Sequence, residues 1–346
     1  MTTEEMRKRL ASFVAAREGV REVRIEGLRP LPGGASRETW SFDAVYERGG
    51  AMLRLPLVLR RDPPGRGETS RREEFLVLRT AYECGLPVPR PYWLGDDEET
   101  LGGRFLVMER VEGETIPRRL LRDELYARAR EVLPAQLAEC LARIHRIELG
   151  REELRGLPAP RRGESVARAE IDRYENLYRL VALEPHPALE LAFRWLRSRA
   201  PVASRLALVH GDFRIGNVVF GPEGLRAVLD WELAHVGDPM EDLGWLCVRA
   251  WRFGRDEKAV GGLADREEFY AAYENAGGFP VDLAAVRFWE AFGNLKWAVI
   301  CLGQARVGLE GQRKNLELGS LGRRTAEVEW ELLELMEEET CRTAPR

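Results

Sequence analysis

The sequence predicts an α+β protein in which a small region of antiparallel strands precedes a larger, mostly helical region. Two observations lead to this prediction. Before residue 112, short strand-like apolar runs are separated by glycine-rich turns. Beyond it, apolar residues recur at helical spacing over long stretches. We therefore expect two domains, residues 1–111 and residues 112–346.

The elements of the first domain follow in order. Apolar residues at helical spacing predict an opening helix over residues 3–17. A second helix is expected over residues 70–84, where Ser70 and Glu73 have the pattern of a capping box. Antiparallel strands are expected at residues 23–28, 38–46, 51–61 and 104–111, the last of them after an extended, proline-rich segment.

The second domain is expected to be built from helices around a short strand-rich segment. Pro134 interrupts a helical pattern over residues 122–146 and fits the first turn of a second helix there. Further helices are expected at residues 165–180, 187–199, 239–252, 265–276, 282–307 and 323–340. The strand-rich segment lies between residues 199 and 239. We expect a ligand to bind in a cleft between the two domains.

The composition limits the class of protein. With 45% hydrophobic and 32% charged residues, the chain has too much core material for a disordered protein and too many charges for a membrane-embedded one. Lys296 interrupts the most apolar stretch, and the N-terminus lacks the apolar centre of a secretory signal. We expect a cytoplasmic protein without a membrane partner. The five cysteines are widely spaced, so neither a disulfide framework nor a zinc site is expected.

The basic residues are almost all arginines, since only four of the 53 are lysines. They alternate with acidic residues, and the formal net charge is −4. Such a mixed surface does not attract a phosphate backbone by itself, so we expect no nucleic-acid partner. No feature of the sequence indicates the oligomeric state.

The strand-rich segment contains the residues that best suit chemistry. Two apolar runs flank Gly221-Pro-Glu-Gly224, which predicts a hairpin with Asn217 and Asp230 nearly opposite each other at its open end. Amide and carboxylate oxygens in that position suit Mg²⁺. Asp212 lies in the loop that enters the hairpin, where it could accept a proton from an attacking hydroxyl. The alternative is a metal-free turn that these residues only cap.

The pattern His210-x-Asp212-x-x-x-x-Asn217, followed by Asp230, resembles the catalytic loop and metal-binding aspartate of the protein-kinase-like superfamily. The Leu-Asp-Trp-Glu run and the Gly-Asp-Pro-x-x-Asp-Leu run from residue 237 are similar to the aminoglycoside phosphotransferase and choline kinase family, in particular to its branch associated with acyl-CoA dehydrogenases. The resemblance covers nearly the whole chain. It implies a bilobed fold, with a small antiparallel-sheet N-lobe for nucleotide and a larger helical C-lobe for catalysis, metal and acceptor.

The resemblance also implies which residues hold the phosphates of ATP. Gly33, Gly34 and Ser36 lie where the family covers these phosphates, although a plain turn is the alternative. Kinases place a lysine on the third strand, but this chain has no lysine between positions 8 and 258. Arg60 is the expected replacement, because strand alternation turns it toward the cleft and Arg61 away. The alternative is a pair of solvated arginines at a strand end.

A glutamate on the following helix should orient the basic residue. The local match to the family favours Glu74 as this partner, and Glu73 is then the capping residue. Residues 105–113 resemble the strand and hinge that hold adenine, which implies contacts from Glu109 and Val111.

Several polar residues are expected to be structural. Asp238 has the pattern of a helix N-cap, with Glu241 as the glutamate of a capping box. His145 is expected to pack before the catalytic loop, and His210 to brace that loop rather than transfer protons. Glu232 could contact a second metal ion or be solvated.

Together these residues imply a small-molecule kinase that uses ATP and Mg²⁺. Asp212 would be the catalytic base, and the acceptor would be a small-molecule hydroxyl, with the favoured branch pointing to a hydroxyacyl compound of acyl-CoA metabolism. An aminoglycoside-modifying kinase is an alternative. A nucleotide-binding regulatory module without transfer activity is another, supported by the missing lysine and opposed by the intact Asp212, Asn217 and Asp230.

Overall fold

The computed structural model describes residues 1–31, 38–62, 71–310 and 316–343. The chain divides into two compact units. Unit 1 comprises Met1–Gly113, Arg151–Gly156 and Arg226–Glu232, and unit 2 comprises Glu114–Gly150, Leu157–Leu225 and Leu233–Arg346. The predicted domain boundary between residues 111 and 112 stays a prediction. It did not anticipate that Arg151–Gly156 and Arg226–Glu232 belong with unit 1.

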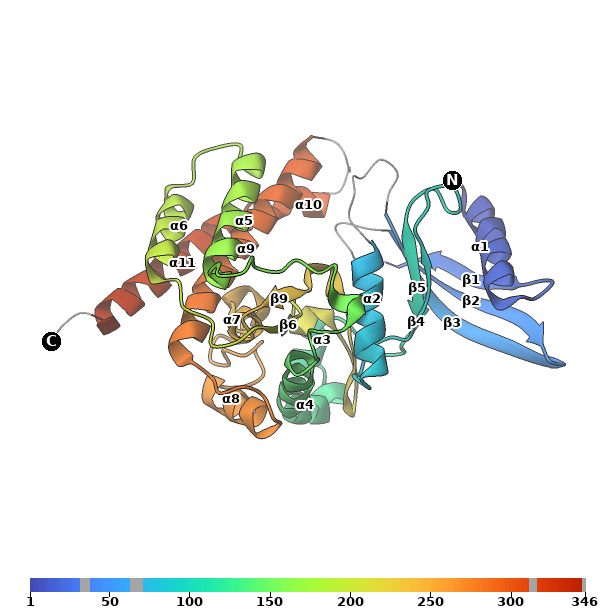
Figure 1. Cartoon of the computed structure of the whole chain (residues 1–346), viewed down its shortest axis with the longest axis horizontal. Coiled ribbons are helices and arrows are strands. Elements are labelled where there is room, and N and C mark those ends of the chain that lie inside the picture. The colour runs from blue at the N-terminus through green and yellow to red at the C-terminus, as the bar shows by residue number, and fades with distance from the viewer. Residues whose placement is uncertain (32–37, 63–70, 311–315, 344–346) are drawn as a thin grey trace. The chain divides into compact units, whose positions relative to one another are not determined.

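Unit 1 contains the expected antiparallel sheet. Its strands have the order β1-β2-β3-β5-β4, and every neighbouring pair is antiparallel (Figure 1). The strands are β1 (Arg24–Pro30), β2 (Glu38–Arg48), β3 (Ala51–Arg61), β4 (Pro91–Gly95) and β5 (Phe105–Glu109), and the helices are α1 (Thr3–Glu18) and α2 (Arg71–Glu83). Strand β4 was expected only as an extended connection. It is possible there because Pro91 lies on an edge strand, where a missing N–H interrupts no central ladder.

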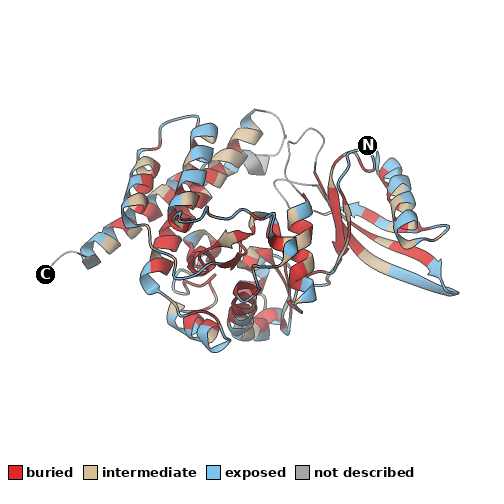
Figure 2. Ribbon diagram, viewed as in Figure 1, coloured by how far each residue is buried: buried red, intermediate tan, exposed pale blue. Residues whose placement is uncertain are grey.

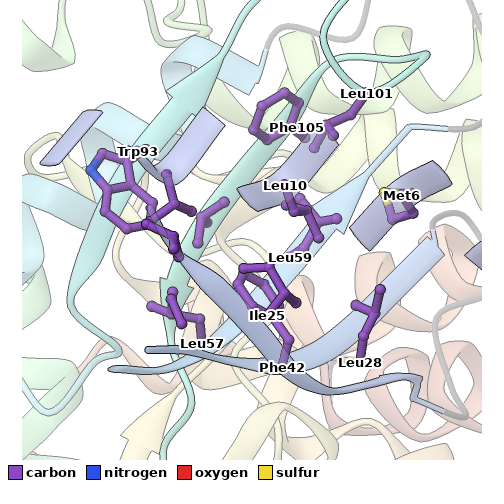
Figure 3. Packing of buried hydrophobic residues seen from close by; sticks show 14 of the residues in the cluster. Met6, Leu10, Ile25, Leu28, Phe42, Leu57, Leu59, Trp93, Leu101 and Phe105 are labelled. Carbon is purple, nitrogen blue, oxygen red and sulfur yellow. The ribbon is translucent and has the colours of Figure 1, made fainter. Parts of the chain in front are cut away.

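Helix α1 covers one face of this sheet. Its buried Met6, Leu10 and Val14 pack in one cluster with residues of the sheet that include Phe42 and Leu59 (Figure 3). Because side chains alternate along a strand, Leu57, Leu59 and Arg61 of β3 share this face, and Val58 and Arg60 lie on the other. Arg61 is buried, and the Arg60 side chain is only 13% exposed, so the alternative of two solvated arginines is wrong.

Unit 2 is mostly helical, as expected. Its helices are α3 (Pro117–Arg122), α4 (Ala127–His145), α5 (Val166–Val181), α6 (Pro187–Arg199), α7 (Met240–Cys247), α8 (Arg266–Asn275), α9 (Leu283–Leu309), α10 (Leu316–Leu321) and α11 (Arg324–Thr343). Helix α9 packs against α5, α6, α7, α10 and α11, which explains why it is buried along most of its length. The outer helices α5 and α6 alternate buried and exposed residues (Figure 2).

Four short strands form the strand-rich segment. They are β6 (Ala207–Val209), β7 (Val218–Gly221), β8 (Gly224–Val228) and β9 (His235–Gly237). Strand β6 pairs with β9, and β7 pairs with β8 as the predicted hairpin. The short β6 and β9 place the residues that follow them, at positions 210 and 238, at the two ends of one small ladder.

Three helix predictions need correction. Pro134 does not begin a second helix, because α4 continues through it. The nearby Leu133 and Leu137 are buried, and their packing offsets the loss of the N–H donor at Pro134. Helix α7 ends at Cys247 rather than at residue 252, and a 3-10 turn (Arg249–Trp251) follows. Helix α10 was not expected. Among the helices of the described residues, none is long and apolar enough to cross a bilayer.

Candidate functional site

The loop that carries Asp212 is fixed by hydrogen bonds inside unit 2. This Asp212 loop (residues 210–217) joins β6 to β7. Asp242 of α7 accepts the backbone N–H groups of His210 at 2.8 Å and of Gly211 at 2.9 Å. His145 holds the same carboxylate through Nε2 at 3.1 Å. His210 Nδ1 accepts the Asp212 N–H at 3.2 Å, so His210 braces the loop as expected.

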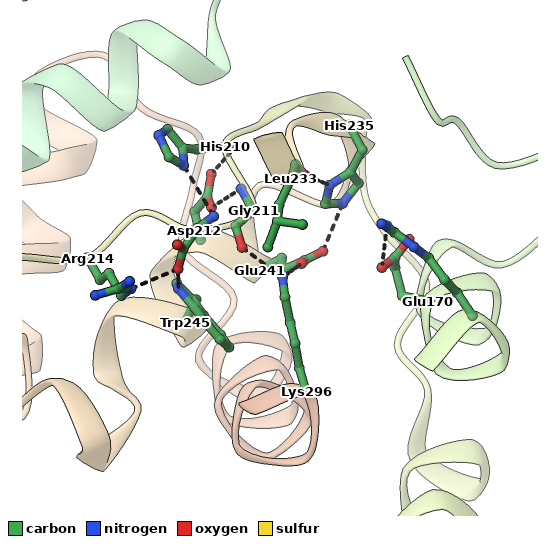
Figure 4. A network of polar contacts seen from close by, with 12 residues as sticks. Glu170, His210, Gly211, Asp212, Arg214, Leu233, His235, Glu241, Trp245 and Lys296 are labelled. Carbon is green, nitrogen blue, oxygen red and sulfur yellow. Dashed lines mark hydrogen bonds and ion pairs between the residues drawn. The ribbon is translucent and has the colours of Figure 1, made fainter. Parts of the chain in front are cut away.

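Three donors orient the carboxylate of Asp212, and Figure 4 shows two of them, Arg214 and Trp245. Its Oδ1 accepts from Arg214 Nε and from Trp245 Nε1, both at 2.9 Å. Its Oδ2 accepts from Asn217 Nδ2 at 2.5 Å. A carboxylate held on both oxygens has one preferred orientation, which is what a positioned general base needs.

Asn217 is oriented by the same contact. Its Nδ2 donates to both the Oδ2 and the backbone carbonyl of Asp212, the latter at 2.9 Å. Since the amide nitrogen is used in this way, the side-chain oxygen is the atom that could meet a cation. This arrangement fits a hard oxygen ligand for Mg²⁺.

In unit 1, Arg60 lies between two carboxylates. Its guanidinium donates to Glu74 Oε1 at 3.1 Å and to Asp230 Oδ1 at 2.7 Å. Burial alone would lower the pKa of Arg60, but Asp230 and Glu74 outweigh this effect and raise the pKa above its ordinary value. The contact with Glu74 is the pair that the sequence analysis expected, whereas the contact with Asp230 was not anticipated.

The pair continues into a larger set of ion pairs that sequence reasoning missed. Arg71, at the start of α2, is 1% exposed and donates to Glu74 and to both carboxylate oxygens of Asp62. Asp62, Arg71, Glu74, Arg60 and Asp230 therefore form a continuous chain of alternating charges, here called the Arg60 chain. Asp230 has a φ of 68°, a backbone conformation that non-glycine residues rarely adopt and that often occurs at functional positions.

A second set of buried charges lies under the Asp212 loop. Lys296 of α9 donates to the Gly211 carbonyl at 2.7 Å and to Glu241 Oε1 at 3.1 Å (Figure 4). Glu241 Oε2 lies 3.1 Å from His235 Nε2, and His235 Nδ1 lies 2.9 Å from the Leu233 carbonyl. Glu241 is therefore not the capping-box glutamate that the sequence predicts, because buried cations compete for its carboxylate. The Asp238 side chain accepts the Met240 N–H at 3.0 Å, but α7 begins at Met240, so the N-cap residue is Pro239 and not Asp238 as predicted.

In this second set, burial shifts the pKa of each residue toward its neutral form, but the oppositely charged partners shift it further toward the charged form. Burial would raise the pKa of Glu241, yet His235 and Lys296 lower it to about 2. Burial would also lower the pKa of Lys296, which Tyr174 and Glu241 raise above its ordinary value. Ligand atoms of Glu170, His235 and Glu241 lie within 4.8 Å of one another, as in a metal site. Lys296 and His235 already supply positive charge there and oppose the binding of a metal cation.

The charge on His235 predicts a pH dependence of stability. Burial would lower the pKa of His235, but Glu241 raises it to about 9, above the ordinary value of 6.5. Its ion pair should therefore stabilise the fold fully below about pH 6.5 and lose this effect as the pH rises through about 9. Urea unfolding of wild type and His235→Gln should show a stability difference that shrinks over this range. A difference that stays constant from about pH 6 to about pH 10 would mean that His235 is neutral in the folded protein.

A pocket of about 720 Å³ in unit 2 is linked to Asp212 by a series of aromatic contacts. Trp297 lines it and makes an edge-to-face contact with Trp251, with ring centroids 4.9 Å apart. The ring centroid of Trp251 in turn lies 5.2 Å from that of Trp245, whose indole N–H donates to Asp212. The lining also contains Arg118, Arg249, Phe253, Arg324 and Val328. The indole nitrogen of Trp297 is buried and has no hydrogen-bond partner among the described residues.

The other predicted residues stay predictions. Gly33, Gly34 and Ser36 lie outside the described residues, as does Ser70, the expected capping partner of Glu73. Glu109 ends β5, where its N–H donates to the Arg90 carbonyl at 2.8 Å. Its role and that of Val111 in adenine binding are untested. Sequence reasoning also missed Trp245 and Lys296; a lone lysine in the apolar pattern of α9 was the available signal for the latter.

Comparison with solved structures supports a kinase-like fold. A protein from Ralstonia eutropha JMP134, whose assigned activity is that of an aminoglycoside phosphotransferase, aligns with a TM-score of 0.69 at 22% identity, covering 96% of this chain and 98% of that one. A ternary complex of a thermostable mutant of aminoglycoside phosphotransferase APH(4)-Ia with AMP-PNP and hygromycin B aligns with a TM-score of 0.57 at 20% identity, covering 95% and 97%. The fold is thus the expected protein-kinase-like α+β fold.

Comparison of sequences identifies the family. Acyl-CoA dehydrogenase family member 10 of Mus musculus is 29% identical over 328 residues, which are 89% of this chain and 30% of that protein. The chain thus spans less than a third of that relative. The model of the phosphotransferase enzyme family matches residues 27–289, which include Arg60, Asp212 and Asp230. The chain belongs to the phosphotransferase enzyme family.

Proposed function

We propose that this protein is a small-molecule kinase that transfers the γ-phosphate of ATP to a hydroxyl group of its acceptor. The observation that carries this proposal is the Asp212 carboxylate, which three donors orient on a loop pinned by Asp242. Asp212 orients the acceptor hydroxyl and accepts its proton as the oxygen attacks the γ-phosphorus in line and ADP leaves. Catalysis of this kind depends on positioning and charge neutralisation.

The proposed ATP and metal site uses the residues that the family resemblance implies. Arg60 binds phosphate oxygens and Glu74 orients it, with Gly33, Gly34 and Ser36 covering the phosphates and Glu109 and Val111 contacting adenine. Asn217 and Asp230 would hold Mg²⁺, and the bound ion would neutralise charge on the phosphates. The residues fit this ion, because both offer oxygen ligands.

The pocket beside Trp297 is the proposed acceptor site. Trp297, Phe253 and Val328 give it apolar surface, and three arginines line it. Arg249 is paired with Asp256 and Glu331, and Arg324 lies 3.6 Å from Glu327. Arg118 makes no ion pair with another described residue. These features suit an acceptor with an apolar chain and an anionic group, such as the hydroxyacyl compound that the acyl-CoA dehydrogenase relatives suggest, better than a polycationic aminoglycoside.

A regulatory module that binds nucleotide without transferring phosphate is the second candidate. The observation in its favour is the contact of Arg60 with Asp230, because an arginine stands where kinases use a lysine and also occupies a proposed metal ligand. The oriented Asp212 opposes this candidate, since a module without transfer activity needs no base.

The test is ATP-dependent phosphorylation of a panel of hydroxyacyl-CoAs, free hydroxy acids, choline-like alcohols and aminoglycosides. We expect acceptor-dependent ADP release with a hydroxyacyl compound, and we expect Asp212→Ala to abolish it. ATP binding that depends on Mg²⁺ without transfer to any acceptor would favour the regulatory module. A protein that binds no ATP would contradict both candidates.

A further inference from the structure

We propose that Lys296 is a positioning residue for Asp212, and that its buried ammonium holds the Asp212 loop and the Trp245 indole in the geometry that phosphate transfer requires. This inference rests on the proposed function. Lys296 lies on α9, 85 residues from its acceptor Gly211, and is 1% exposed. Within the described part of the chain, no hydrogen bond or ion pair joins it to Asp212, so it acts through its neighbours.

The first route runs through the backbone. Lys296 Nζ donates to the carbonyl of Gly211, the residue immediately before Asp212, at 2.7 Å. Gly211 has a φ of +78°, and a Cβ added to it would lie 2.4 Å from the Leu233 carbonyl oxygen. The peptide therefore has little room to shift on that side. With the two N–H bonds to Asp242, the peptide groups before Asp212 are held from both sides.

The second route runs through the indole of Trp245. Lys296 Nζ lies 4.7 Å from the centroid of this ring, within the range of a cation–π contact. Trp245 Nε1 donates to Asp212 Oδ1 at 2.9 Å. One ammonium thus contacts both the backbone that leads into Asp212 and the side chain that orients its carboxylate (Figure 4).

The remaining contacts keep the ammonium in place. Glu241 accepts from Lys296 and is itself held by His235. His235 Nδ1 lies 2.9 Å from the Leu233 carbonyl oxygen, the same atom against which Gly211 packs. The contacts therefore close a ring through Gly211, Lys296, Glu241, His235 and Leu233. A purely stabilising ion pair between Lys296 and Glu241 would not require the ammonium to reach Gly211.

The test compares Lys296→Met with Lys258→Met. Lys258 is a matched control, because it is a lysine with its own carboxylate partner, Asp265 at 2.7 Å, on the surface. We expect Lys296→Met to lower kcat by about tenfold to a hundredfold at a temperature where both variants are folded, with the KM for ATP unchanged, since small misplacements of a catalytic group cost this much. Lys258→Met should keep wild-type kcat and KM.

A double variant separates positioning from stability. Lys296→Met/Glu241→Gln also removes the carboxylate that loses its ammonium partner in Lys296→Met, and His235 can become neutral without it, so the stability of the double variant should differ from that of Lys296→Met. Its kcat should stay low, because Gly211 and Trp245 still lack the ammonium. Recovery of kcat together with stability would overturn the proposal, as would a fall in kcat that only follows the melting temperature.

A measurement without turnover tests the proposal even if the proposed kinase function fails. The indole N–H resonance of Trp245 can be assigned by its loss in Trp245→Phe. We expect its exchange with solvent to be faster in Lys296→Met and in the double variant, because the hydrogen bond to Asp212 loosens, and unchanged in Lys258→Met. An exchange rate equal to that of wild type in all variants would overturn the proposal.

Discussion

Asp212→Asn is expected to lower kcat for acceptor phosphorylation by about 10²–10⁴-fold, the usual contribution of a positioned general base. The substitution preserves the size of the side chain but replaces one carboxylate oxygen by an NH₂ group. That group cannot accept from Asn217 or Trp245, each of which now donates to Asp212. It also cannot take a proton from a hydroxyl at neutral pH. Steady-state kinetics with saturating acceptor and varied ATP measure the effect.

The KM for ATP should change little in this variant, because the proposed phosphate contacts come from Arg60 and not from Asp212. Asp172→Asn is a matched control, since Asp172 is an exposed aspartate on α5 whose partner is Arg197 at 2.5 Å. We expect the control to behave like wild type. If Asp212→Asn keeps a kcat within about threefold of wild type, a loss too small for a general base, then Asp212 is not the base.

Much of the fold can be predicted from the sequence because its elements have local signals. The strands of unit 1 alternate, and α1, α5, α6, α8, α9 and α11 have helical periodicity, so their centres were predicted correctly. Strand β4 was missed because Pro91 argues against a central strand, and only the sheet order shows that it lies at the edge. Pro134 was misjudged because tertiary packing of α4 overrides the local cost of a proline.

The site was predictable where its residues are close in sequence. Asp212 and Asn217 are five residues apart, and their contact follows from one short loop. Lys296 could not be placed in this way, because its acceptors are 85 and 55 residues distant along the chain. The role of Glu241 was wrong for the same reason. A local capping pattern is weaker than two buried cations, and only the fold brings those cations to the carboxylate.

Arg71→Met is expected to destabilise the protein by about 3–5 kcal/mol, as breaking a buried charge pair from one side commonly does. Arg71 is the guanidinium that Asp62 and Glu74 share, and the side chains of these partners are 8% and 5% exposed. Methionine keeps much of the side-chain volume, so the loss should reflect charge and hydrogen bonding rather than a cavity. Urea unfolding followed by circular dichroism measures the change.

Arg79→Met provides the control on the same helix, because the Arg79 side chain is 40% exposed and lies 3.8 Å from Glu83. We expect it to change stability by at most about 1 kcal/mol, as for other surface ion pairs. Arg71→Met should also reduce the thermal stabilisation by ATP, because Glu74 is the residue through which Arg71 reaches Arg60. If Arg71→Met lowers stability but ATP still stabilises the variant as much as wild type, then the Arg60 chain supports only the fold of unit 1. If Arg71→Met leaves stability unchanged, then Asp62 and Glu74 do not depend on Arg71.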